Sequence, residues 1–353
     1  MEIGISTFVE TTPDVNTGEV ISHAQRIIEV VEEIILADQV GLDVFGVGEH
    51  HREDFAASSP AVILAAAASK TKRIRLTSAV TVLSSADPVR VFQDFATVDA
   101  ISNGRAEIMA GRGSFIESFP LFGFDLKDYD ELFEENLELL LKIRESEKVT
   151  WRGGHRPAIE NLGVYPRPIQ NPLPVWIGSG GNSNSVMRAG LLGLPLVLAI
   201  IGGSPLQFEP LVRLYKRAVA HAGHDLSKLT VASHSHGFIA EDTQTAANKF
   251  FPSTQQVMNK LGKERGWGPY SRSSFDAARS FEGALYVGDP KTVADKIIHL
   301  RKNVGITRFM LHLPVGTMPH EDVMRAIELL GKEVAPIVRE EVSKWEDSSN
   351  GTV

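Results

Sequence analysis

The sequence contains no cysteine, which excludes disulfide bonds, thiolate metal ligands and a cysteine nucleophile. It also lacks an excess of positive charge: the net charge is −8 at pH 7, which argues against nucleic acid as the main partner. The start, MEIGISTF, has no basic leader, and the most apolar segment, 191–203, is too short to span a bilayer. We therefore expect a cytoplasmic protein with no membrane role.

What the sequence does contain is a regular alternation of short β-branched runs and longer apolar segments of helical period. The strand candidates are Glu2–Thr7, Asp43–Gly48, Ile74–Val80, Arg105–Gly111, Pro174–Gly180, Pro195–Ile201, Thr230–Ala240 and Ile306–Leu313. The helix candidates are Val20–Val40, Pro60–Ser69, Pro88–Ile101, Tyr129–Glu145, Ser183–Leu192, Phe208–Ala222, Thr243–Gly262, Pro290–Asn303 and Pro319–Glu341. Apolar strands that alternate with helices predict a parallel sheet, either open and doubly wound or closed on itself. A count of eight favours a single (β/α)₈ TIM barrel, and a chain of 353 residues is long enough for one.

Three segments do not follow the alternation. The segment 149–169 has hairpin-like runs bounded by glycine and proline, and it is predicted as an insertion before the fifth strand. The segment 251–288, rich in Gly, Ser and Arg, follows the seventh strand and is a candidate lid or irregular loop. We assign the barrel domain to residues 1–340 and a C-terminal tail to 341–353, of which 347–353 is expected to fray.

Unusual polar and glycine-rich stretches follow four successive predicted strands. They are GEHHRED (48–54), SAVTVLSSADP (78–88), GRGSF (111–115) and GSGGNSNS (178–185). Barrel enzymes place their active sites on the loops at the carboxyl ends of the strands, so these stretches are expected to meet there. This clustering is more informative than any single motif.

The stretch GSGGNSNS joins a predicted strand to a predicted helix, and it suits a phosphate. Its glycines permit close backbone approach, and Asn182 or Ser183 can cap the helix, whose first N–H groups attract anions. Arg112, flanked by glycines at the preceding strand end, could reach the same phosphate. The alternatives are a flexible connecting loop and a surface salt bridge of Arg112. Small residues in 78–90 fit either a flat ring resting on the backbone or ordinary barrel packing.

Two pairs of histidines raise the question of a metal. Adjacent side chains on an extended chain point to opposite sides, so His50 and His51 are not expected to share one task. His234 and His236 lie on one face of the seventh strand, as in metal hydrolases, but the first strand offers no complementary ligands and no HExxH motif is present. We therefore expect no metal site, with one of these two histidines at the barrel mouth and the other packed in its wall.

The four stretches together resemble a known family. The motifs GEHHREDF (48–55), TSAVTVLSSADPVRVFQDFATVDAISNGRAEIMAGRGSF (77–115), PVWIGSGGNSNSVMRAGLLGLP (174–195) and YVGDPKTVADKI (286–297), in this order, are similar to those of bacterial luciferase-like, flavin-dependent oxidoreductases. The resemblance covers roughly residues 1–340. It implies a (β/α)₈ barrel with an excursion before strand five and a mobile loop after strand seven.

The resemblance also implies a cofactor and its site. FMN would lie across the barrel mouth, with its phosphate at Arg112 and at the loop of Gly180, Gly181, Asn182 and Ser183. Its ring would rest near Ala79 and Val80, where the family often has a non-prolyl cis peptide. His50 matches the family's catalytic histidine, with Glu49 before it, and His51 would turn into the structure.

The implied reaction is oxidation of a small, aldehyde-like organic substrate by reduced FMN and dioxygen, with His50 suited to proton transfer. No NAD-binding fingerprint is present, so a separate flavin reductase is the expected transient partner, and the family commonly forms homodimers. A deazaflavin-dependent dehydrogenase, a non-catalytic flavin-binding protein and a metal hydrolase built on His234 and His236 are the competing hypotheses. Light emission is not implied, because glycine precedes Arg112 where the luciferase α subunit has cysteine.

Overall fold

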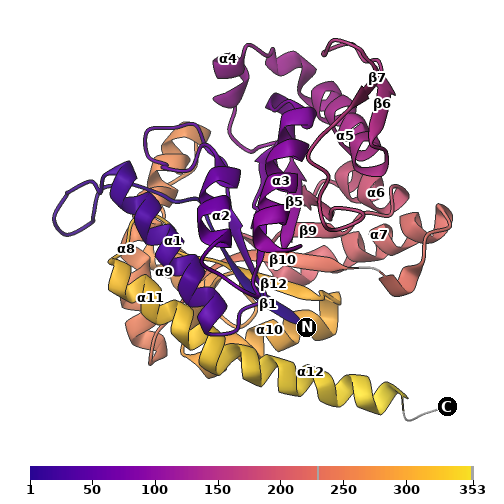
Figure 1. Cartoon of the computed structure of the whole chain (residues 1–353). Helices are drawn as coiled ribbons and strands as arrows, with labels where there is room; N and C mark the ends of the chain where they lie inside the picture. Colours follow the sequence, from indigo (N-terminus) through magenta and orange to yellow (C-terminus); the bar gives the residue numbers. More distant parts are fainter. Residues whose placement is uncertain (229, 351–353) are drawn as a thin grey trace.

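The computed structural model describes residues 1–228 and 230–350, and its centre is a closed barrel of eight parallel strands (Figure 1). The strands of the ring are β1 (Glu2–Thr7), β2 (Val44–Val47), β3 (Arg75–Ser78), β5 (Ala106–Gly111), β8 (Val175–Ser179), β9 (Leu196–Ala199), β10 (Val231–Ile239) and β12 (Arg308–His312). Each pairs in parallel with the next, and β12 pairs with both β10 and β1, so the sheet has no free edge. The predicted (β/α)₈ fold is confirmed.

The barrel interior is filled by side chains rather than hollow. One buried apolar cluster contains residues from most strands of the ring, among them Val44, Met109, Trp176, Val197 and Met310. The larger apolar core lies between the strands and the surrounding helices. Strands that are buried on both faces explain the near-continuous apolar runs in the sequence.

Helices surround the barrel in Figure 1, with α12 lying across the lower part of the molecule. They are α1 (His23–Gln39), α2 (Pro60–Ala68), α3 (Pro88–Ser102), α4 (Ser118–Phe122), α5 (Tyr129–Glu145), α6 (Ser183–Leu191), α7 (Glu209–His221), α8 (Thr243–Arg265), α9 (Arg272–Ala278), α10 (Pro290–Val304), α11 (His320–Leu329) and α12 (Ala335–Asn350). Several begin where a capping side chain precedes the first turn. The Asp87 carboxylate accepts hydrogen bonds from the N–H groups of Val89 and Arg90, and Asp289 accepts one from Thr292.

The segments outside the alternation have defined structures. Within the insertion 149–169, strands β6 (Lys148–Trp151) and β7 (Ile159–Gly163) form an antiparallel hairpin. For the segment 251–288, one of the two expectations was an irregular loop, and this expectation is wrong. The segment holds the second half of α8, all of α9 and the short strand β11 (Tyr286–Gly288), which pairs with β10. A further short strand, β4 (Thr81–Val82), pairs with β5.

The predicted tail is also more regular than expected. Helix α12 continues beyond Glu341 to Asn350. Residues 347–350 are therefore helical, where a fraying tail was predicted. Residues 351–353 of the predicted tail lie outside the described residues. Among the described helices none is both long and apolar enough to cross a membrane.

The two ends of the barrel differ in chemistry. At the amino end, the buried guanidinium of Arg308 on β12 donates to Glu107 on β5 at 2.6 Å and to Glu2 on β1 at 2.7 Å, and it lies 4.2 Å from the ring of Trp176. These contacts close that end. The carboxyl ends of the strands, in contrast, surround a cavity.

Candidate active site

A cavity of about 390 Å³ lies at the carboxyl ends of the barrel strands, within the size range of small-molecule sites. Its wall is built by residues that end or follow the strands of the ring, and by the second half of α8. Of the predicted site residues, Glu49, His50, Ala79, Val80, Arg112 and Gly180 line this cavity. Gly181, Asn182 and Ser183 lie just beyond the wall, at the start of α6.

A non-prolyl cis peptide joins Ala79 to Val80 directly after β3. The Val80 side chain projects toward β5 and β8, where the sequence has glycine. A Cβ placed on Gly111 would lie 2.6 Å from Val80 Cγ2, and one on Gly178 would lie 3.0 Å from Val80 Cγ1. The neighbouring strands therefore have glycine at the two positions that face the Val80 side chain. The cis peptide expected from the family resemblance is present.

Both carboxylate oxygens of Glu49 have partners. Oε2 accepts a hydrogen bond from the N–H of Val82 at 2.9 Å, and Oε1 lies 2.8 Å from Nε2 of His51. Glu49 thus ties the loop after β2 to the segment that follows the cis peptide. His51 lies outside the cavity wall and contacts the Phe122 ring, the arrangement expected of a supporting histidine.

His50 lies in the cavity wall among aromatic rings. Its ring centroid is 4.3 Å from Phe55, 4.7 Å from Phe8 and 5.0 Å from Phe115. Its Nδ1 is 4.0 Å from Oε1 of Glu117. Burial opposes ionisation of Glu117, but the nearby His50 and Arg52 outweigh burial and lower the pKa of this carboxyl. A carboxylate beside Nδ1 favours a proton on that atom, which leaves Nε2 as the acceptor.

Arg112 lies in the cavity wall and also forms a salt bridge. Its Nη1 donates to Asp130 Oδ1 at 2.5 Å. The register of β5 with β8 pairs Ala110 with Ile177, which places Arg112 beside the glycine-rich loop that starts at Gly178. Gly180 borders open space, since no atom lies within 4 Å of an added Cβ. The Asn182 side chain caps α6 and accepts from Asn184 and Ser185, so it is engaged within the helix.

Four polar side chains, here called the histidine–glutamate cluster, line the opposite side of the cavity. They are Glu10, His234, His236 and His312. His312 Nδ1 lies 3.2 Å from His234 Nε2 and 3.3 Å from Ser6 Oγ, and its Nε2 lies 3.7 Å from Glu10 Oε1. Both His234 and His236 face the cavity, so the expectation that only one of them would reach the barrel mouth is wrong. Successive inward positions of one strand explain this outcome.

Burial controls the protonation of this cluster. It raises the pKa of Glu10 to about 7, because the carboxylate loses its hydration. It lowers the pKa of His236 and of His312 to about 3, and it lowers that of His234 well below its usual value. At neutral pH the three imidazoles are therefore uncharged.

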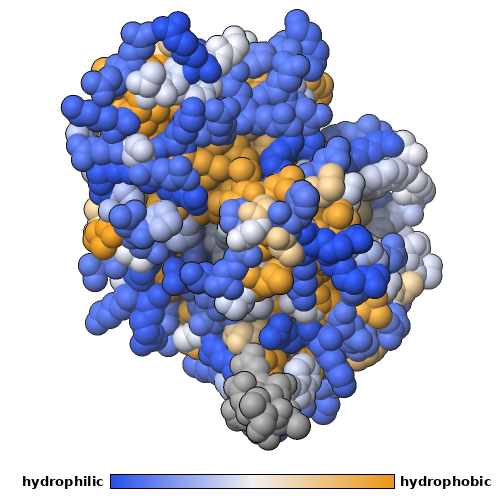
Figure 2. Space-filling view, turned by 90° about the vertical axis from the view of Figure 1, so that its right-hand side faces the viewer, coloured by the Kyte–Doolittle hydropathy of each residue, from blue (hydrophilic) through white to orange (hydrophobic). Residues whose placement is uncertain are grey.

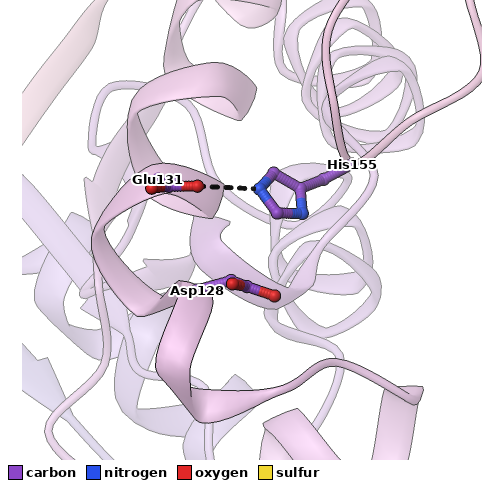
Figure 3. Close-up of side chains that lie close together, drawn as sticks. All are labelled: Asp128, Glu131 and His155. Atoms are coloured by element: carbon purple, nitrogen blue, oxygen red, sulfur yellow. Dashed lines mark hydrogen bonds and ion pairs between the residues drawn. The ribbon is translucent and has the colours of Figure 1, made fainter.

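One group among the described residues has the spacing of metal ligands, and it lies on the surface. Figure 3 shows Asp128, Glu131 and His155, with His155 Nε2 at 3.4 Å from Glu131 Oε2. None of the three lines the cavity, and the Glu131 side chain is 77% exposed. Within the described chain the cavity histidines form no such group. The geometry therefore gives no support to the metal-hydrolase hypothesis.

Helix α8 forms the outer wall of the cavity with Met258, Leu261 and, beyond its end, Trp267. Two ion pairs connect it to the loop after β2. Lys260 Nζ lies 2.7 Å from Asp54 Oδ2, and Arg52 forms two hydrogen bonds with Glu264. The predicted lid segment therefore covers the cavity as a helix that is held by charged side chains.

Sequence reasoning missed several of these residues. Glu10, Phe8, Phe55 and His312 follow or end strands that were predicted correctly, so their place at a strand end was the available signal. The isolated bridge between Glu10 and Phe55 is a contact between distant parts of the chain, and no local pattern indicates it.

The fold and the cavity define a (β/α)₈-barrel protein with a small-molecule site at the carboxyl ends of its strands. Residues 1–308 match the family model described as luciferase-like monooxygenase, and the chain belongs to this family. N-acetyl-S-alkylcysteine monooxygenase from Bacillus subtilis is 30% identical to it, over 84% of this chain and 90% of that protein.

Solved structures share the fold. Monooxygenase RslO1 from Streptomyces bottropensis superposes with a TM-score of 0.81 at 23% identity, over 95% of this chain and 99% of that one. The oxygenating constituent of 3,6-diketocamphane monooxygenase from Pseudomonas putida, in complex with FMN, gives 0.73 at 22% identity, over 95% and 98%. An F420-dependent secondary alcohol dehydrogenase gives 0.73 at 20% identity, over 96% and 98%. Solved proteins that share this fold thus include one in complex with FMN and one that is F420-dependent.

Proposed function

We propose that this protein is an FMN-dependent monooxygenase that uses reduced flavin and dioxygen to oxidise a small organic compound. The observation that supports this most is the convergence of His50, Arg112, Gly180, Ala79 and Val80 in one cavity. One relative, which is 30% identical over 84% of this chain, is a monooxygenase. This favours oxygen transfer over hydride transfer alone.

The residues present fit a flavin phosphate and a flat ring. The Arg112 guanidinium and the open backbone at Gly180 offer hydrogen-bond donors for a phosphate, and the amino end of α6 adds its dipole. In this proposal Gly181, Asn182 and Ser183 contribute through their backbone and the capped helix start. Ala79 and Val80 offer an apolar surface against which a ring can lie.

The chain's own residues have distinct tasks in this proposal. The bound flavin would supply the two-electron redox chemistry. His50 holds or moves a proton at Nε2, while Glu117 beside Nδ1 orients its ring. Glu49 fixes the backbone at Val82 and thereby the surface beneath the flavin. The aromatic rings around His50 and the wall formed by α8 exclude water.

A separate flavin reductase is the proposed source of reduced FMN, and the protein is proposed to form a homodimer. Exposed apolar side chains near α1 and α2 support the homodimer. Val20, just before α1, is 60% exposed, Ile28 on α1 is 54% exposed, and Val62 on α2 is 70% exposed. Figure 2 shows that the surface on another face is largely hydrophilic, with apolar residues gathered in a hollow of its upper half. Light scattering of the purified protein measures the oligomeric state.

The cofactor and the reaction can be tested in sequence. Absorbance and mass spectrometry of the purified protein identify a bound flavin or deazaflavin, and a bound deazaflavin would contradict the FMN assignment. Oxygen uptake with reduced FMN and a panel of aldehydes, ketones and thioethers then tests turnover. Substrate-dependent oxygen consumption is the expected result, and its absence across the panel would favour a binding protein without turnover.

A further inference from the structure

The cavity is divided between two arcs of the barrel. The residues proposed to hold the cofactor follow or end β3, β5 and β8, whereas the histidine–glutamate cluster belongs to β10, β12 and the segment after β1. In the ring, β10, β12 and β1 are consecutive, and they lie opposite β3, β5 and β8. A cofactor on the first arc therefore leaves the second arc to face the substrate.

Glu10 lines this second arc and has one oxygen without a partner among the described residues. The residue is 4% exposed and lines the cavity, and its Oε2 is buried with no hydrogen-bond partner among the described residues. A buried polar atom without a partner is costly in a folded protein and points to a missing ligand or water. The other oxygen, Oε1, is the one beside Nε2 of His312.

Among the described residues that face Glu10, the one guanidinium, that of Arg26, already has a carboxylate partner. The groups that face Glu10 are His312 on β12, His236 on β10, His50 after β2 and Arg26 on α1. The guanidinium of Arg26 is already paired with Glu33, at 2.7 Å, and His236 and His312 are uncharged at neutral pH. Among the described residues no arginine or lysine lines this arc, whereas Arg52, Arg112, Lys260 and Arg265 line other parts of the cavity.

We propose that Glu10, through the hydrogen of a protonated Oε2, binds the carbonyl or hydroxyl oxygen of a neutral substrate, and that the histidine–glutamate cluster makes Glu10 the residue that selects uncharged substrates. The inference rests on the proposed function for the position of the cofactor. Burial favours the protonated form of a carboxylic acid, and a protonated acid can donate a hydrogen bond. A carboxylate ligand would be rejected, because it would lie in this arc without a cation.

The pH dependence follows from the protonation of Glu10. Its pKa is raised to about 7, so the donor is present below that pH and is lost as the pH rises above it. Affinity for a neutral acceptor is therefore highest in mildly acidic solution. A glutamine at this position keeps an N–H donor at every pH and removes the titration.

Three probes of similar shape test the proposal by calorimetry: acetophenone, ethylbenzene and benzoate. They are titrated into the protein with and without FMN, between pH 5.5 and 8.5. We expect acetophenone to bind about three- to tenfold more tightly than ethylbenzene below pH 7, which is the range for one neutral hydrogen bond. Benzoate is expected to bind more weakly than either. The preference for acetophenone should decline above pH 7.

Glu10→Leu is expected to abolish that preference, and Glu10→Gln to retain it without the pH dependence. Ethylbenzene binding by both variants shows that the cavity is intact. The proposal is overturned if acetophenone does not exceed ethylbenzene in the native protein, or if Glu10→Leu keeps the preference. Because binding needs no turnover, failure of the oxygen-uptake assay leaves this result readable, and a monooxygenase that binds benzoate best would contradict only the role of Glu10.

Discussion

Two adjacent histidines have different surroundings in this protein. His50 lies in the cavity among aromatic rings, and His51 is bonded to Glu49 outside the cavity wall. The extended chain after β2 turns successive side chains to opposite sides, which explains how neighbours in sequence reach such different environments. The roles of both residues can be separated by substitution.

His50→Ala is expected to leave FMN affinity unchanged and to lower coupled product formation by about 10²- to 10⁴-fold, the usual contribution of a positioned proton-transfer group. FMN binding is measured by fluorescence titration, and coupling by the ratio of product to oxygen consumed. His155→Ala, at an exposed position outside the cavity, is the matched control. Normal coupling in His50→Ala would remove this residue from the proposed mechanism.

Arg112→Ala is expected to weaken FMN binding by about 1.5–3 kcal/mol, the range for a hydrogen bond to a charged group. Arg112→Lys should recover part of the loss, because a point charge replaces the planar donor. Equilibrium dialysis measures both. Arg188→Ala on α6 removes an arginine that pairs with Glu134 outside the cavity wall and serves as the control. An unaltered affinity in Arg112→Ala would place the phosphate elsewhere.

How much of the site could be predicted from the sequence depends on whether a feature follows from local sequence pattern or from contacts between distant parts of the chain. Arg112 and Gly180 follow predicted strands, and the parallel barrel brings such positions together wherever they occur in the chain. Glu10 follows a predicted strand, but its burial could not be predicted, because it depends on a bridge to Phe55 and on packing against distant elements. Local pattern therefore located strand ends, whereas the environment of each side chain required the assembled molecule.

At the level of elements, two expectations overlapped at α8: a helix over Thr243–Gly262, and a lid or irregular loop over 251–288, which is rich in Gly, Ser and Arg. The structure agrees with the helix. The helix continues to Arg265 and ends at Gly266, whose φ of 72° is the left-handed conformation that favours glycine. Packing of Met258 and Leu261 at the cavity outweighs the low helix propensity of this stretch.

The ion pairs between α8 and the loop after β2 are expected to control the mobility of α8 more than overall stability. Arg52→Met should increase hydrogen exchange at the end of α8 and change the unfolding free energy by less than about 1 kcal/mol, because exposed pairs contribute little. Lys291→Met, which removes an exposed pair on α10, is the control. Exchange at α8 that matches the control would show that these pairs do not hold the helix.

At the level of the whole molecule, the two barrel ends divide stability from chemistry. The amino end is closed by Arg308 with Glu107 and Glu2, and it lies away from the cavity. Conservative changes there are expected to affect folding and to leave ligand binding intact, as is usual for barrels. The alternation of eight apolar strands with helices favoured this architecture over an open sheet, and the family resemblance added to that evidence.

Glu107→Ala is expected to lower the unfolding free energy by about 3–5 kcal/mol, because it leaves the buried Arg308 with only the partly exposed Glu2. Urea denaturation measures this loss. Glu138→Ala, at an exposed helical pair with Lys142, should change stability by less than about 0.5 kcal/mol. A similar stability for the two variants would mean that Arg308 finds compensation when Glu107 is absent.

The chain has four tryptophans, and one of them lies at the mouth of the cavity. Trp267 lines the cavity and is 51% exposed, whereas Trp151 and Trp176 are buried in the hairpin and the barrel interior, and Trp345 lies on α12. The emission of Trp267 should therefore be quenched by energy transfer when a flavin binds nearby. Occupancy of the mouth can be followed optically in the unlabelled protein. Trp176 packs with Ala79 and Val80 and should be quenched as well, so Trp267→Phe is expected to reduce the signal while it keeps an aromatic ring.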